Sequence, residues 1–149
     1  MNQKARERMI DRIRQNAIAN TKMDILRGKI IRVAVYKRLK EYHNQQITSI
    51  DLLMHDYKAL AKQYGWTMVG VYFDQGCDNS GRDELIEECR AGRIDLIITR
   101  SIVRFGRIDE TISIAERLLP VGIYFEEQNL YTPSDLHLLR QIISSGLLD

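Results

Sequence analysis

Cysteine, proline and tryptophan are scarce in this sequence of 149 residues, which has two, two and one of them. Two cysteines cannot form a disulfide framework, and the spacing of Cys77 and Cys89 does not suit a metal site. We therefore expect no metal and a reducing, cytoplasmic compartment. Apolar runs are at most a few residues long, which argues against a membrane-spanning helix. With 44% hydrophobic and 28% charged residues, the composition is typical of a soluble globular protein.

Positive charge is concentrated at the N-terminus, although the net charge is only +2. Residues 1–29 contain three acidic side chains and eight basic ones, namely Lys4, Arg6, Arg8, Arg12, Arg14, Lys22, Arg27 and Lys29. Apolar residues from Met9 to Ile18 have helical spacing, and Gly28 is suited to end a second short helix. We predict a basic helical arm over residues 1–29. Such a segment attracts polyanions, most often nucleic acid, and a solvated helix face is the alternative.

The rest of the chain, residues 30–149, alternates between two kinds of pattern. Runs rich in β-branched residues predict strands at 30–36, 66–73, 94–99 and 121–125. Helical spacing predicts helices at 49–64, 82–91 and 112–119 and a last helix from Ser134, with Ser49 as an N-cap and Gly65 and Gly92 as stops. This alternation predicts an α/β domain with a mostly parallel sheet of four or five strands and helices on both faces.

Basic residues follow the first three predicted strands. They are Lys37, Arg38 and Lys40, then Arg82, then Arg100, Arg104 and Arg107. The carboxyl ends of parallel strands meet at one edge of a sheet, where ligands bind. Guanidinium groups brought together there favour a bound anion, and phosphate suits their geometry. The alternative is a set of surface ion pairs with Glu41, Asp74, Asp83 or Asp109.

Other phosphate chemistries fit this sequence less well. No glycine-rich turn follows the first strand, so no dinucleotide fingerprint, P-loop or other cofactor motif is predicted. The segment from Cys77 to Arg82 is one residue shorter than a cysteine-phosphatase loop and lacks the preceding histidine. The three histidines, at positions 43, 55 and 137, are scattered and have neither metal nor catalytic-triad spacing.

Several segments, in order, resemble the catalytic domain of serine site-specific recombinases, the resolvase/invertase family. Residues 32–40, Arg-Val-Ala-Val-Tyr-Lys-Arg-Leu-Lys, are similar to its first strand and active-site loop. Gln46 and Ser49, and later Asp74, Gly76 and Arg82, follow with near-family spacing. The block Arg-Phe-Gly-Arg at 104–107, after the strand at 94–99, is the most specific match. The resemblance covers about residues 30–149 and implies a resolvase-like fold.

In that family a serine attacks a DNA phosphodiester and arginines stabilise the phosphate charge. The resemblance assigns phosphate-binding roles to Arg38, Arg82, Arg104 and Arg107, and assigns the nucleophile position to Lys40. An amine with an ordinary pKa of about 10.4 is protonated at neutral pH and cannot attack. We therefore predict a recombinase-like protein that binds phosphate, with Lys40 as a further cation, and does not cleave DNA. Val103 is a second departure, because the family has a polar residue there.

Two alternatives remain open: a fragment or nucleophile-replaced variant of an active recombinase, and a non-catalytic oligomerisation module. Compared with the family, we expect a last helix that is cut short and no C-terminal DNA-binding domain. The expected partners are DNA backbone phosphates, an active recombinase subunit and further copies of this chain, as a dimer or tetramer.

Overall fold

A computed structural model describes residues 3–4, 31–39 and 44–146 of the chain. The basic arm predicted for residues 1–29 lies outside the described residues apart from positions 3 and 4, and so does Lys40. The helices and strands are β1 (Arg32–Leu39), α3 (Asn44–Tyr64), β2 (Thr67–Gln75), α4 (Ser80–Arg90), β3 (Leu96–Thr99), α5 (Ile102–Phe105), α6 (Ile108–Leu118), β4 (Gly122–Phe125), β5 (Leu130–Thr132) and α7 (Leu136–Ser144).

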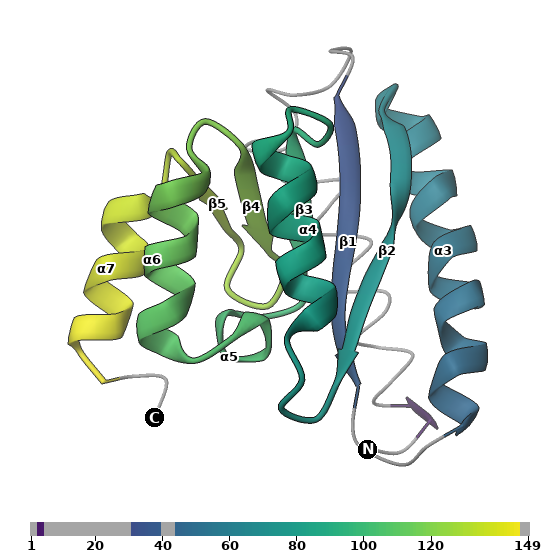
Figure 1. Cartoon of the computed structure of the whole chain (residues 1–149), viewed down its shortest axis with the longest axis horizontal. Helices are drawn as coiled ribbons and strands as arrows, with labels where there is room; N and C mark the ends of the chain where they lie inside the picture. Colours follow the sequence, from purple (N-terminus) through teal and green to yellow (C-terminus); the bar gives the residue numbers. More distant parts are fainter. Residues whose placement is uncertain (1–2, 5–30, 40–43, 147–149) are drawn as a thin grey trace.

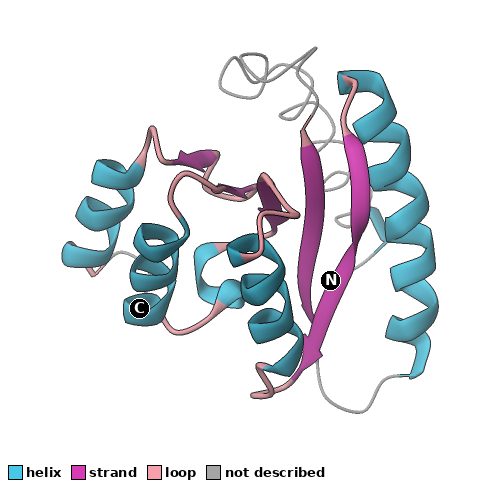
Figure 2. Cartoon of the chain, turned by 45° about the horizontal axis from the view of Figure 1, so that its top comes forward, coloured by secondary structure: helices cyan, strands magenta, loops and turns pink. Residues whose placement is uncertain are grey.

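The five strands form one sheet in the order β2-β1-β3-β4-β5. Strands β1 to β4 are parallel, and β5 adds an antiparallel strand to β4. Figure 1 shows α3 beside the β2 edge and α6 and α7 toward the β5 edge. Figure 2 shows α3 and α4 on opposite faces of the sheet. The predicted α/β fold, with a mostly parallel sheet flanked by helices, is confirmed.

Side-chain alternation along β1 divides the core into two layers. Ala34 and Tyr36 pack with residues of α4, α5 and α6 on one face, whereas Val33 and Val35 pack with residues of α3 on the other. All four residues of β3 are buried, as expected of a central parallel strand covered on both faces. Within the described residues, no helix combines the length and apolar character needed to cross a bilayer.

The structure moves two predicted helix starts by four or more residues and adds a helix. The helix predicted at 112–119 begins at Ile108. The helix predicted from Ser49 begins at Asn44, so Ser49 lies inside α3 rather than at its cap. A serine is favoured at an N-cap, but residues 44–48 continue the helix, so the local preference does not decide the boundary. The short helix α5 was not predicted, and its N-cap is Ser101, whose Oγ accepts a bond from the Arg104 amide at 3.3 Å.

Gly81, in the first turn of α4, lies directly against the backbone of β2. A Cβ at this position would collide with the Phe73 carbonyl oxygen and would lie 2.9 Å from Asp74 Oδ1. Gly81→Ala should therefore lower the free energy of unfolding by about 1–3 kcal/mol, because α4 must move away from the sheet. The matched control is Gly70→Ala in β2, where a Cβ would meet nothing closer than Tyr72 Cε2 at 4.0 Å. Equal urea-unfolding curves for the two variants would contradict this packing.

Candidate functional site

The carboxyl ends of β1, β2 and β3, here called the carboxyl edge, bring together four of the predicted site residues. Arg38 is near the end of β1, Arg82 is in the first turn of α4, Arg104 is in α5 and Arg107 is the N-cap of α6. Arg38 donates to the Arg104 carbonyl oxygen, and Arg82 donates to the Phe105 carbonyl oxygen. The four arginines therefore gather around α5.

A buried carboxylate fixes this edge. Asp74, at the end of β2, is only 3% exposed. It accepts bonds from the Tyr36 hydroxyl at 2.7 Å and from the amides of Gly81 and Arg82 at 2.7 and 2.9 Å. A negative charge is stabilised at a helix N-terminus, where amides have no partner within the helix. Asp74 thus joins β1, β2 and α4, and its bonds to the first turn of α4 place Arg82 beside α5.

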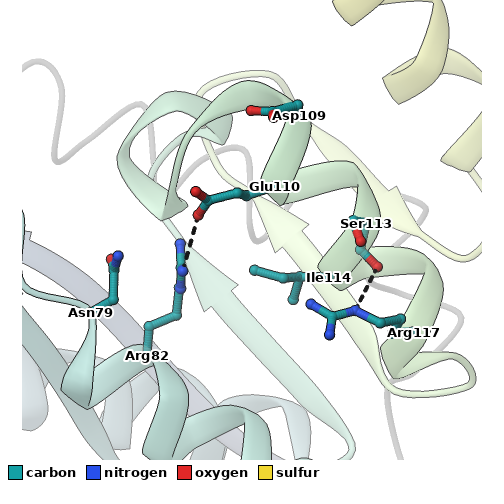
Figure 3. A pocket seen from close by; sticks show the side chains of 7 residues that line it. All are labelled: Asn79, Arg82, Asp109, Glu110, Ser113, Ile114 and Arg117. Carbon is teal, nitrogen blue, oxygen red and sulfur yellow. Dashed lines mark hydrogen bonds and ion pairs between the residues drawn. The ribbon is translucent and has the colours of Figure 1, made fainter.

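The guanidinium of Arg82 is buried and already neutralised. Nη1 donates to the Phe105 carbonyl oxygen at 3.2 Å, and Nη2 pairs with Glu110 Oε2 at 3.1 Å (Figure 3). Its Nε is buried without a hydrogen-bond partner among the described residues. Gly106 leaves room for this arrangement, since a Cβ there would collide with Arg82 Nη1. Arg82 therefore contributes little net charge to the carboxyl edge.

Arg38 is also engaged, but only by neutral acceptors. Nη1 donates to the carbonyl oxygens of Gly76 and Asp78 at 2.9 and 2.6 Å, and Nη2 donates to Asn79 Oδ1 at 2.6 Å. Nε donates to the Arg104 carbonyl oxygen at 3.1 Å. A guanidinium bonded to carbonyl and amide oxygens keeps its full positive charge, so Arg38 differs from Arg82 in electrostatic effect.

Arg104 and Arg107 face solvent. The side chain of Arg104 has no ion pair or hydrogen bond with the described residues, and its neighbour Val103 is 45% exposed. Arg107 Nε lies 3.8 Å from Asp109 Oδ1, and both side chains are more than three-quarters exposed. An ion pair that exposed contributes little. These two guanidinium groups, here called the outer arginines, are therefore exposed and lack a strong counter-charge among the described residues.

A cavity of about 420 Å³ lies between α4 and α6 (Figure 3). It is lined by Asn79, Arg82, Asp109, Glu110, Ser113, Ile114 and Arg117. Arg82 is paired with Glu110 inside it, and Arg117 Nε donates to the Ser113 carbonyl oxygen at 3.4 Å. Two carboxylates and two guanidinium groups line this cavity, so its lining has no excess of positive charge that would favour an anion.

The geometry also argues against the cysteine-phosphatase alternative. In the loop after β2, the Asp78 carboxylate accepts bonds from the Ser80 amide and hydroxyl, each at 3.0 Å, and these bonds lower the pKa of Asp78. A loop that uses its own carboxylate to satisfy a helix-start amide does not offer that amide to a phosphate. No group of three or more histidine, cysteine or acidic side chains among the described residues is placed to hold a metal.

Sequence reasoning missed a second buried carboxylate, on the α3 face of the sheet. Glu126 follows β4 directly and is 7% exposed. The Tyr57 hydroxyl lies 2.8 and 2.9 Å from its two carboxylate oxygens. Burial raises the pKa of Glu126 to about 7, while Tyr57, Arg100 and Lys37 act in the opposite direction. Inspection of the end of the fourth strand would have identified Glu126, but not its partner 69 residues earlier.

The fold is similar to those of three solved recombinase and integrase domains. A resolvase family site-specific recombinase from Streptococcus pneumoniae has a TM-score of 0.59 and 18% identity, over 78% of this chain and 87% of its own. For the N-terminal catalytic domain of TP901-1 integrase, the TM-score is 0.57 and the identity 16%, over 79% of this chain and 99% of that domain. For the C-terminal catalytic domain of ISC1926 TnpA, an IS607-like serine recombinase, the TM-score is 0.52 and the identity 17%, over 76% of this chain and 79% of that domain. No protein-family profile and no curated protein matches the sequence. These similarities confirm the predicted resemblance at the level of the fold.

The buried Glu126 makes the stability of this fold dependent on pH. Its folded pKa of about 7 lies above the ordinary 4.5, so the folded state holds a proton that the unfolded state has lost between these values. Stability from this group is present below pH 4.5 and is lost as the pH rises to 7, by about 3 kcal/mol in total. Glu126→Gln, which cannot ionise, should remove this loss from urea-unfolding measurements between pH 4 and 8.

The matched control is Glu127→Gln, which changes the next carboxyl group in the chain. Glu127 is 44% exposed and pairs with Arg100 at 3.1 Å. We expect this variant to keep the pH dependence of the unmodified protein. The same slope of stability against pH in all three proteins would show that Glu126 does not bind a proton on folding.

Proposed function

We propose that this chain is a serine-recombinase-like domain that binds the phosphate backbone of DNA at its carboxyl edge, in connection with site-specific recombination, without cleaving DNA itself. The observation that carries this proposal is the pair of outer arginines, Arg104 and Arg107, which project from α5 and the start of α6. The similarity in fold to solved recombinase domains supports the choice of DNA among possible phosphate ligands.

The outer arginines suit a phosphodiester for physical reasons. Each guanidinium offers a planar set of N–H donors that can bind two oxygens of one phosphate. Arg104 lies in α5, and Arg107, three residues further on, is the N-cap of α6. Both are exposed, and neither has a strong counter-charge among the described residues. The charge of Arg38 behind them is not neutralised by its bonds, and it adds to the attraction for an anion. Lys40 would contribute a further charge by its place in the sequence.

The absence of cleavage follows from the side-chain chemistry. A protonated lysine at position 40 has no lone pair for attack on phosphorus. Two hydroxyls at the carboxyl edge are already committed. Ser101 is 1% exposed and caps α5, and Tyr36 donates to Asp74 while burial raises its pKa above the ordinary value. Neither hydroxyl is placed to replace a serine nucleophile.

A domain that binds DNA without cutting it can act by associating with an active recombinase subunit or with copies of itself. Helix α7 supports such an association, because Leu136, Leu138, Ile142 and Ile143 on it are only partly buried against the core. Packing within the chain accounts for part of this apolar surface. The proposal therefore includes self-association through α7 as a dimer or tetramer.

DNA binding by the outer arginines should depend strongly on salt. Arg104→Ala and Arg107→Ala should each weaken binding to a mixed-sequence duplex roughly tenfold and lower the slope of log Kd against log salt concentration by about 1. Fluorescence anisotropy of a labelled duplex between 50 and about 200 mM salt measures both quantities.

The matched control for this experiment is Arg90→Ala. Arg90 is 55% exposed in the last turn of α4, at the opposite end of that helix from the carboxyl edge, and it pairs weakly with Glu87 at 3.7 Å. This variant should bind DNA as the unmodified protein does. Equal losses from Arg90→Ala and Arg104→Ala would indicate attraction by net charge and would overturn a phosphate site at α5.

Cleavage is tested separately with a pool of plasmid fragments and denaturing electrophoresis. The unmodified protein should give no DNA adduct that resists SDS, because Lys40 cannot form the phosphoserine linkage expected of the family. Lys40→Ser is the comparison that restores the hydroxyl. An SDS-resistant adduct with the unmodified protein, lost in Lys40→Ala, would show an active enzyme and contradict the non-cleaving role.

A further inference from the structure

Arg38 joins two segments that are distant in the sequence. Its guanidinium donates to the Gly76 and Asp78 carbonyl oxygens and to Asn79 Oδ1 in the loop between β2 and α4. From the other side, its Nε donates to the Arg104 carbonyl oxygen in α5. The segments lie about 40 and 66 residues along the chain from Arg38. One side chain therefore sets the position of the loop relative to α5.

The end of α5 needs such support because of its length. It is a single turn of four residues, so the carbonyl groups at its C-terminal end have no partner within the helix. Arg38 satisfies the Arg104 carbonyl and Arg82 satisfies the Phe105 carbonyl. A cation is also favoured next to the negative end of a helix. Two guanidinium groups thus hold α5 from its inner side, while the Arg104 side chain points outward.

We propose that Arg38 is a positioning residue, which holds α5 and the loop before α4 so that Arg104 and Arg107 meet a DNA phosphate together, and that Arg38 itself does not contact that phosphate. This inference rests on the proposed function for its outer arginines. It assigns Arg38 a role that differs from the direct phosphate contact implied by the family resemblance. The reason is the donor inventory: four donor bonds of its guanidinium are already made inside the protein.

Lysine cannot replace Arg38 in this role. A lysine ammonium keeps the positive charge but presents its donors from one nitrogen, which cannot reach acceptors on both segments. Arg38→Lys therefore keeps the positive charge and removes the bonds that position the two segments. Arg38→Gln, which removes the charge as well, is the second variant and shows how much the charge adds.

Cys77 lies in the loop that Arg38 holds and provides a probe of it. Its side chain is exposed, whereas Cys89 is buried and burial raises the pKa of the Cys89 thiol to about 12. A thiol-specific spin label will therefore react at Cys77. In the protein without DNA, Arg38→Lys should increase the rotational mobility of this label at least roughly twofold, because the loop loses its bonds to the guanidinium. Arg90→Lys should leave the label unchanged.

The DNA readout is a double-mutant cycle measured by anisotropy of a labelled duplex. Arg38→Lys should weaken binding roughly tenfold in the unmodified background but less than about twofold when Arg104 and Arg107 are already alanine, because Arg38 acts through them. General loss of stability would instead weaken binding equally in both backgrounds.

Two results would overturn the inference. One is a label at Cys77 that stays immobile in Arg38→Lys while DNA affinity falls as far as in Arg104→Ala, which would make Arg38 a direct phosphate contact. The other is a mobile label with unchanged affinity, which would make its bonds irrelevant to binding. If the outer arginines prove neutral for DNA binding, the proposed function fails, and the label experiment still reports on the loop.

Discussion

The carboxyl edge depends on one buried carboxyl group, that of Asp74. Among the described residues, no cationic side chain is bonded to the Asp74 carboxylate, which accepts bonds from a tyrosine hydroxyl and two helix-start amides. Burial of an ionised carboxylate is costly unless such bonds are complete. They oblige α4 to begin against the end of β2, with Gly81 in contact with the strand. Arg82 then reaches α5, and the arginine arrangement follows from that contact.

The arginines at this edge differ in the acceptors to which their guanidinium groups donate. Arg82 is buried against Glu110, Arg38 is bound by neutral oxygens, and Arg104 and Arg107 face solvent. Within the described part of the chain, the guanidinium groups of Arg104 and Arg107 have no strong counter-charge and are exposed to a ligand. The fold that carries them is shared with solved recombinase domains at 16–18% identity. In the proposed function, DNA binds at α5, Arg38 and Arg82 support that helix, and Lys40 is the reason why no cleavage is expected.

The sequence allowed the fold to be predicted, but not the separate roles of the arginines in the candidate site. The strand predicted at 94–99 is present as Leu96–Thr99, and α3 ends at Tyr64, next to the expected stop at Gly65, because both features depend on local preferences. Helix α5 was missed because its four residues are too few to show a period. The Arg38 guanidinium is bonded inside the protein whereas that of Arg104 is exposed. This difference depends on acceptors about 40 to 66 residues away from Arg38, which a local sequence pattern does not show. The Tyr57–Glu126 bond was missed for the same reason.

The most direct test is to observe the arginine side chains themselves while a short DNA duplex is added. Nitrogen-15 NMR resolves arginine Nε–Hε groups, and Arg38 Nε reports its own bond to the Arg104 carbonyl oxygen. We predict that the Arg104 and Arg107 signals shift with DNA and return as salt is raised, while the Arg38 and Arg82 signals stay in place. Large shifts at Arg38 with none at Arg104 and Arg107 would contradict the division of the arginines and the site that depends on it.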